Sequence, residues 1–188
     1  VGVEFDVLTG QEVEAFDVEG LERYLLEEYL LMRRLEGYDL KRLFPVIKAS
    51  GALPHGRVGE CVYEEVRRGV EEFASKIDSR RRSGSVGSVT ADLKVGEYRV
   101  TGSLVHVYPE WLLRYRYARI KAKDVLRTWI VHLVFNSLEE WECPKRSLLV
   151  GLSRDRVCEG REYAPLASAR ELLHTVLDLY WSGLRRPL

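Results

Sequence analysis

The sequence predicts an α/β domain in which a mixed β-sheet is flanked by helices and preceded by a helical segment. Three observations support this class. Apolar residues repeat with a helical period up to residue 77, the period changes to two from residue 89, and helical patterns then alternate with short strands. The length of 188 residues, with 46% hydrophobic and 31% charged residues, is typical of one globular domain.

Three helices are predicted before residue 78. The first, at 18–36, has Asp17 as a candidate N-cap, Gly37 as a stop and apolar residues near helical spacing: Leu21, Tyr24, Leu25, Met32 and Leu35. A shorter helix follows at 39–49, where Pro45 marks a kink or an early end. A long helix is expected over 59–77, because its apolar positions advance in steps of three and four: Val62, Val66, Val70, Phe73 and Ile77.

Residues 79–88 are polar and lack apolar periodicity, which is typical of a linker or an exposed loop. Three consecutive antiparallel strands are then predicted at 89–95, 97–108 and 111–117. A helix at 122–138, a short hairpin of 146–158 with 161–163, and a helix at 165–184 complete the chain. We therefore expect a single domain over 1–188, with a helical part at 17–78 and an α/β core at 89–188.

Composition excludes several classes of protein. Lys and Arg number 29 and Asp and Glu number 29, so no net charge attracts nucleic acid or an anionic membrane, and electrostatic binding must come from local patches. No run of about eighteen apolar residues exists, which excludes a transmembrane span. The chain begins at Val1 and contains one methionine, as expected of a fragment of a longer protein.

Cysteine and histidine spacing argues against a metal or disulfide scaffold. The three cysteines form no CxxC pair and the four histidines are dispersed, so a reducing, cytoplasmic setting is expected. Cys61 is expected to be a small buried residue, and the histidines in helices to be core or surface residues. No phosphate-binding glycine loop is present, so we expect neither ATP nor another cofactor.

The most informative segment runs from Gly102 to Arg127. In metal-dependent DNA nucleases of the PD-(D/E)XK kind, adjacent strands supply an Asp, then an Asp or Glu followed by a Lys, and the carboxylates bind the metal that activates water. The strand, hairpin, strand and helix predicted here have the shape of that fold. However, Val105 stands where the first Asp would be, and Arg114 and Arg116 stand where the second acid and the Lys would be. Two cations repel a divalent ion, so no catalytic residue and no metal ligand is expected.

The same segment is a candidate DNA-binding surface. From Arg114 to Arg127 the net charge is plus five, and aromatic residues lie among the basic ones. The candidate DNA-binding residues are Arg114, Arg116, Arg119, Lys121 and Lys123. Alternation along a strand places Arg114 and Arg116 on one face and Tyr115 and Tyr117 on the other, which favours the tyrosines for the core.

Two alternatives stay open at this point. The arginines could pair with residues 1–36, which carry a net charge of minus seven, or with a partner subunit, which would make the chain a protein-interaction module without DNA contact. Alternatively, an active metal-dependent nuclease could draw its ligands from Glu60, Asp92 and Glu110, which are distant in sequence and would need folding to bring them together.

An ordered set of short motifs carries a family resemblance from about residue 17 to the end. The motifs are Glu22-Arg23-Tyr24, Lys41-Arg42-Leu43-Phe44, Gly51-Ala52-Leu53-Pro54-His55-Gly56, Gly59-Glu60, Thr101-Gly102, Leu112-Leu113-Arg114-Tyr115-Arg116, Trp129-Ile130-Val131-His132-Leu133 and Ala164-Pro165-Leu166-Ala167 leading to Tyr180. This set resembles the C-terminal domain of RecC, the gamma subunit of exodeoxyribonuclease V.

The resemblance implies a PD-(D/E)XK fold that has lost its active site, which agrees with Val105, Arg114 and Arg116. It also implies a subunit that assembles with RecB and RecD in a cytoplasmic RecBCD helicase and nuclease for recombinational DNA repair. Such a domain would help to split forked duplex DNA and to guide single strands without reading sequence. The domain itself would not be an enzyme.

Overall fold

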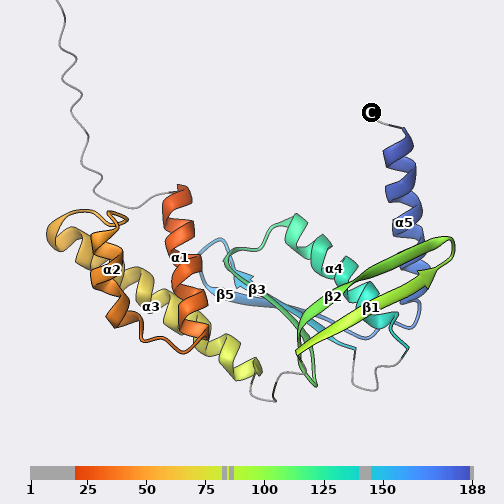
Figure 1. Cartoon of the computed structure of the whole chain (residues 1–188), viewed down its shortest axis with the longest axis horizontal. Helices are drawn as coiled ribbons and strands as arrows, with labels where there is room; N and C mark the ends of the chain where they lie inside the picture. The colour runs from red at the N-terminus through yellow and green to blue at the C-terminus, as the bar shows by residue number, and fades with distance from the viewer. Residues whose placement is uncertain (1–19, 82–83, 85–86, 140–144, 187–188) are drawn as a thin grey trace, which may run out of the picture. The chain divides into compact units, whose positions relative to one another are not determined.

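The computed structural model describes residues 20–81, 84, 87–139 and 145–186, and the chain divides into two compact units, Val1–Glu71 and Glu72–Leu188. Helices come first, followed by three strands, a helix, two strands and a last helix (Figure 1). This order, together with a five-stranded mixed sheet, confirms the predicted α/β class. In the described part of the chain, no helix has the length and apolar character needed to cross a membrane.

The first unit is helical. It contains α1 (Gly20–Leu35), the short 3-10 helix η1 (Leu40–Leu43), α2 (Phe44–Ala49) and the first part of α3 (Gly56–Arg81). The helix predicted at 39–49 is thus divided in two. Pro45 lies in the first turn of α2, where its missing N–H is no loss, so it begins a helix there and does not kink one.

The buried face of α1 differs from the predicted one. Leu21, Leu25 and Met32 are exposed, whereas Leu26, Leu30 and Leu31 are buried with Glu27 beside them. Adjacent leucine pairs allow two apolar faces on this helix, so its periodicity alone does not select one. The Arg23 guanidinium lies 3.1 Å from Glu27 on the same helix and 2.6 Å from Glu65 of α3, so Arg23 links α1 to α3.

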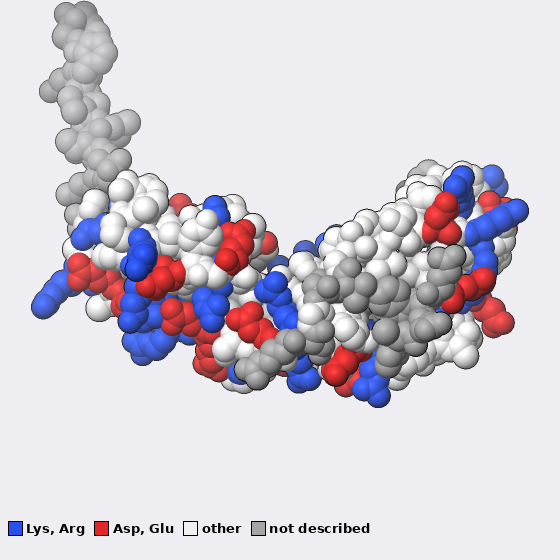
Figure 2. All heavy atoms as spheres, turned by 60° about the horizontal axis from the view of Figure 1, so that its bottom comes forward, with Lys and Arg blue, Asp and Glu red and all other residues white. Residues whose placement is uncertain are grey.

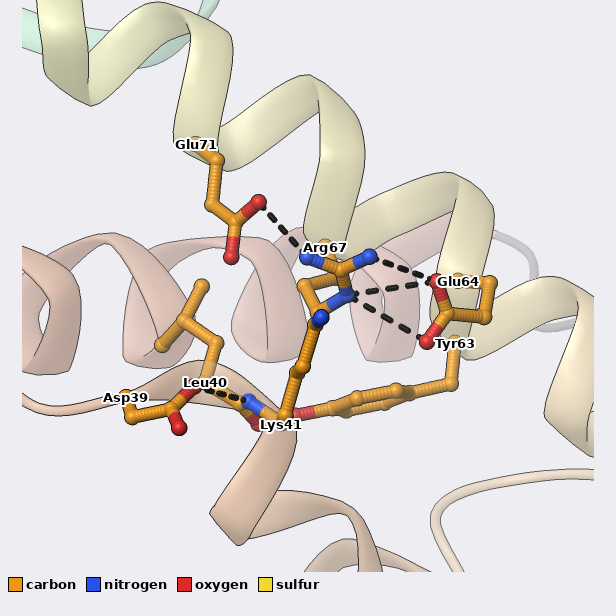
Figure 3. A network of polar contacts seen from close by, with 7 residues as sticks. All are labelled: Asp39, Leu40, Lys41, Tyr63, Glu64, Arg67 and Glu71. Atoms are coloured by element: carbon orange, nitrogen blue, oxygen red, sulfur yellow. Dashed lines mark hydrogen bonds and ion pairs between the residues drawn. The ribbon is translucent and has the colours of Figure 1, made fainter.

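Polar contacts join α3 to the segment before α2 (Figure 3). The buried Tyr63 hydroxyl donates to the Leu40 carbonyl at 2.5 Å, and burial raises the Tyr63 pKa to about 12. On the same helix Arg67 donates to Glu64 at 2.7 Å and to Glu71 at 2.6 Å. Protonated Tyr63 therefore satisfies a buried carbonyl, which would be costly to leave unpaired.

The long helix α3 extends beyond its predicted end. Residues 79–81 belong to it and β1 begins at Gly87, so the segment between the two elements is shorter than the predicted linker at 79–88. Its predicted apolar positions are largely confirmed, since Val66, Val70, Phe73 and Ile77 are buried. The division between the two compact units falls within α3, after Glu71. The single domain and its internal boundaries remain predictions.

The second unit is built on the mixed sheet, in the strand order β1-β2-β3-β4-β5. Its elements are β1 (Gly87–Val95), β2 (Tyr98–Val107), β3 (Leu112–Arg119), α4 (Ala122–Asn136), β4 (Ser147–Leu152), β5 (Cys158–Tyr163) and α5 (Ala169–Arg185). The pairs β1–β2, β2–β3 and β4–β5 are antiparallel, and β3–β4 is parallel. A parallel pair needs a crossover connection, which α4 provides.

The core of this unit lies between the strands and helices α4 and α5. Its buried apolar residues are Ala91, Leu93, Val95, Leu104, Val107, Leu112, Leu133, Phe135, Leu138, Ala169 and Leu173. The predicted face of α5 is confirmed in its first half, but Tyr180 and Trp181 near its end are exposed. Cys61 in the first unit is also exposed, contrary to prediction, because Tyr63 takes the buried position of that turn. Cys143 lies outside the described residues.

His132 is a buried core residue with a defined tautomer. Its Nε2 lies 3.0 Å from the Ala164 carbonyl, which only accepts, so Nε2 carries the proton. Its Nδ1 then accepts from the Ser147 hydroxyl at 2.8 Å. Burial lowers the His132 pKa, which keeps the ring neutral. The expectation of a core histidine is confirmed here.

We expect the free energy of unfolding to fall as the pH drops below about 6.5. Because the folded-state pKa of His132 is lowered, the unfolded chain binds this proton more readily, and protonation favours unfolding. The stabilisation by neutral His132 is complete above about pH 6.5. It is lost between that pH and the pKa of His132 in the folded chain, by up to about 1.4 kcal/mol per pH unit. Urea unfolding at pH 7.5, 6 and 5 measures it.

The matched variants are His132→Gln and His106→Asn. His106 also has a lowered pKa and contributes with the same sign, so each variant should remove one part of the pH dependence. An identical pH dependence in His132→Gln and the unaltered chain would contradict the assignment.

Candidate nucleic-acid interface

The sheet opens between β2 and β3. Their pairing is confined, within this described stretch, to Val107 opposite Leu112, and the β1–β2 hairpin then diverges from β3 (Figure 1). At the same place β2 carries a bulge against β1, since it has two residues, Val105 and His106, where β1 has only Ser88. Bulges bend a strand and increase its twist. We call this region the fork and define it as Val105 and His106 on β2 with Arg114, Tyr115 and Arg116 on β3.

The fork contains Val105, Arg114 and Arg116, the three residues that the sequence sets against a nuclease motif, on two strands that pair only at its base. Counting two residues along each strand from the Val107–Leu112 pair reaches Val105 and Arg114, which stand at corresponding positions on its two sides. Arg116 follows two residues further along β3. Val105 is 53% exposed and carries no polar group, so it supplies no metal ligand.

The predicted alternation along β3 is confirmed by contacts. The Tyr117 ring meets Phe73 of α3 edge-on with centroids 5.2 Å apart, whereas Arg116 reaches Asp124 of α4. Tyr115 packs against His106 at 5.4 Å between ring centroids. Both tyrosines are half-buried on the side of Phe73, whereas the main apolar core, with Leu112 of β3, lies on the α4 side of the sheet. The prediction that the tyrosines face the core is therefore wrong for this core.

Asp124 neutralises Arg116. The Arg116 Nη1 donates to Asp124 Oδ1 at 2.7 Å, and the Lys121 backbone N–H donates to Asp124 Oδ2 at 2.9 Å. Burial opposes ionisation of Asp124, but these two interactions outweigh it and lower the pKa of the carboxyl. Asp124 therefore both caps α4 and holds a fork arginine in place.

Arg114 is in a different environment. Its side chain is half-buried, and within the described residues it forms no ion pair. Burial lowers the pKa of its guanidinium, and the like charge of Arg127 on α4 lowers it further. A partly desolvated cation beside another cation is a natural position for an anion.

His106 is strained and lies in a positive field. Its φ of 59° is in the left-handed region, which costs a non-glycine residue roughly 1–3 kcal/mol. Burial lowers its pKa, and the cations Arg81 and Arg114 lower it further. The sequence does not reveal this feature, because a left-handed bulge residue is normally glycine and here it is a histidine.

The other three predicted DNA-binding residues lie beyond the fork. Arg119 ends β3, Lys121 precedes α4 and Lys123 lies in its first turn, and all three are exposed. The structure thus divides the five candidates into a half-buried pair, Arg114 and Arg116, and an exposed group of three. Their role in DNA binding remains a prediction.

The carboxylates of the alternative nuclease are not brought together in the described structure. Asp92 accepts two hydrogen bonds from Arg99, at 2.9 and 2.7 Å, on the β1–β2 hairpin. Glu60 lies 3.7 Å from Lys48 within the first unit, and Glu110 is exposed in the turn before β3.

A different trio, Glu97, His174 and Asp178, comes within metal-coordinating reach, with its ligand atoms inside 4.8 Å. However, His174 already faces Glu97 at 3.4 Å and Asp178 at 3.1 Å, one through each ring nitrogen. Tyr98 donates to Asp178 at 2.9 Å. These contacts tie the β1–β2 turn to α5, and they account for the trio without a metal ion.

The fold and the fork together define a class: an α/β domain with an open mixed sheet whose opening carries arginines rather than carboxylates. The family described as the RecC C-terminal domain matches residues 2–188. The chain belongs to this family, as its motifs predicted.

Curated relatives agree with the family assignment. The chain is 33% identical to RecBCD enzyme subunit RecC of Escherichia coli (strain K12) over 124 residues, which are 66% of the chain and 11% of that protein. It is 25% identical over 177 residues to the subunit of Buchnera aphidicola subsp. Schizaphis graminum, covering 93% of the chain and 16% of that protein. It is 26% identical over 189 residues to that of Mycobacterium tuberculosis (strain CDC 1551 / Oshkosh), covering 98% and 17%. The chain therefore spans 11 to 17% of the length of these relatives.

Proposed function

We propose that this chain is a non-catalytic, PD-(D/E)XK-like domain that contacts DNA in a RecBCD-type helicase and nuclease. In this role it supports strand separation, DNA channelling and subunit assembly during recombinational repair of double-strand breaks in the cytoplasm. Its partners are RecB, RecD and forked or single-stranded DNA, which it binds without reading sequence. The nuclease activity belongs to the complex rather than to this domain.

The observation that carries the proposal is the composition of the fork. The order of β2, β3 and α4 is compatible with a PD-(D/E)XK site, and the sequence comparison sets Val105, Arg114 and Arg116 against its acids and lysine. The metal-dependent chemistry of such nucleases requires carboxylate ligands. An arginine-lined opening favours phosphate binding instead.

DNA contact has to be local, because positive and negative side chains are intermixed on the described surface visible in Figure 2. The net charge of the chain is zero. The basic segment at the end of β3 and the start of α4 supplies a local positive patch, and such patches give affinity that falls as salt rises.

The test uses end-labelled forked DNA, the full 188-residue chain and excess Mn²⁺, a permissive nuclease metal. We expect uncut DNA on a denaturing gel and retarded DNA on a native gel, with retardation decreasing between about 50 and 200 mM salt. Cleavage that is lost in Asp92→Ala or Glu110→Ala would make the chain an enzyme and overturn the proposal. Absence of retardation at low salt would favour the protein-interaction module.

A further inference from the structure

We infer that the fork seats one phosphodiester group of a bound DNA strand, held by Arg114 and Arg127 within electrostatic reach of His106. The inference rests on the proposed function, since it names the ligand group and the residues of that same surface. In this arrangement Arg114 supplies the positive charge that a bound metal supplies in a nuclease.

The first support is the contrast between Arg114 and arginines elsewhere in the described structure. Arg67 and Arg99 each have carboxylate partners within 2.7 Å. Arg114 is half-buried and has no such partner among the described residues, although its planar guanidinium is suited to two parallel hydrogen bonds with a phosphate. Partial burial of the charged Arg114 guanidinium without a nearby anion is unfavourable, because the charge loses part of its hydration. A bound phosphate would offset this desolvation cost.

The second support is the field at the fork. The charged groups that act on His106 are Arg81 at the end of α3 and Arg114 on β3, both positive, and the Tyr115 ring packs against it. Arg127 adds a further positive charge beside Arg114. Arg81 itself lies 3.7 Å from Asp78 and is partly neutralised, whereas Arg114 forms no ion pair among the described residues.

The third support is the strained bulge. His106 adopts a left-handed conformation within the bulge of β2 against β1, one residue from the point where β2 and β3 stop pairing. Strained residues of this kind are kept where surrounding structure holds them for a purpose, and bulges recur beside binding sites.

A strand phosphate fits this position better than a free anion, because further cations continue along the chain. Arg119 follows five residues after Arg114, which is about 16 Å of strand. Lys121 and Lys123 come next and are exposed. A polyanion can contact both the fork and this exposed group, whereas a single phosphate ion contacts one of them.

The experiment measures the affinity of the full chain for labelled forked DNA between about 50 and 200 mM salt. Arg114→Gln should weaken binding about five- to eightfold near 0.1 M salt and reduce the log–log salt slope by about 0.7–0.9, as expected for one lost phosphate contact. The control Arg99→Gln changes the net charge by the same amount as Arg114→Gln, at an exposed position of the β1–β2 hairpin. It should leave the affinity and the salt slope within about twofold of the unaltered chain. Arg114→Met removes the same charge, keeps an apolar stem and should show the same two losses if Arg114→Gln does not fold, whereas Arg114→Lys should restore the slope.

A second readout is the pKa of His106, followed by its ring resonances during a pH titration. DNA should raise it in the unaltered chain, because a phosphate offsets the nearby cations, and should leave it unchanged in Arg114→Gln. An unchanged salt slope in Arg114→Gln, with DNA still bound by the unaltered chain, would overturn the inference and leave the proposed function standing. A His106 shift with inorganic phosphate but not with DNA would also overturn it. If the unaltered chain binds no DNA, the proposed function is wrong and the inference with it.

Discussion

Simultaneous charge reversal of Arg119, Lys121 and Lys123 to Glu is expected to weaken DNA binding on the order of 10²–10³-fold near 0.1 M salt. These side chains are exposed at the junction of β3 and α4. Each phosphate contact contributes about 0.9 to the log–log salt slope, or about eightfold in affinity at 0.1 M, and three contacts multiply. Repulsion by the new carboxylates adds to the loss, and the salt slope should fall by about three.

The fold should survive this change. The cap of α4 uses the backbone N–H of Lys121 and the Asp124 carboxylate, and neither is altered. A matched triple, Arg57→Glu, Arg68→Glu and Arg154→Glu, changes the net charge by the same amount at exposed positions outside the basic segment. If both triples weaken binding equally, the effect is one of net charge, and no local interface exists at the end of β3.

Much of the fold could be predicted from periodicity. The spacing of apolar residues changes from three or four to two after α3, and this change correctly separated the helices from β1, β2 and β3. The helix predicted to begin at Ala122 is the one that forms the crossover of the parallel β3–β4 pair. Side-chain alternation also assigned Arg116 and Tyr117 to opposite faces of β3. These properties depend on local spacing, which a sequence displays directly.

The fork could be predicted only in part. The sequence allowed Val105, Arg114 and Arg116 to be compared together with a nuclease motif. The bulge at His106 could not be predicted, because two residues opposite one is a property of the pairing between strands. From the sequence, Arg114 and Arg116 were also predicted to be equivalent DNA-binding residues. The difference between them depends on Asp124, whose carboxylate reaches one arginine from α4. The buried face of α1 was predicted wrongly for a related reason, because which of its leucines are buried depends on packing against the rest of the helical unit.

Replacing Gly59 with Ala is expected to lower the free energy of unfolding by roughly 1–3 kcal/mol, the range typical of overpacking. Gly to Ala within a helix usually stabilises by up to about 1 kcal/mol, because alanine has the better helix propensity. At Gly59 the added Cβ would overlap the Pro54 carbonyl oxygen and lie 3.1 Å from its carbon. Those are backbone atoms of the turn before α3, so no side-chain rotation relieves the contact. The sign of the usual effect is therefore reversed.

Gly183→Ala is the matched control, because Gly183 is also helical and a Cβ there meets nothing within 4 Å. We expect it to stabilise by up to about 1 kcal/mol or to be neutral. Urea unfolding followed by circular dichroism at 222 nm measures both variants. Circular dichroism is preferable to tryptophan fluorescence, because the four tryptophans all follow residue 110 in the sequence and report poorly on the unit that contains Gly59. Equal stabilisation of the two variants would show that the turn before α3 moves away freely, and the close packing of Gly59 against Pro54 would then contribute nothing to stability.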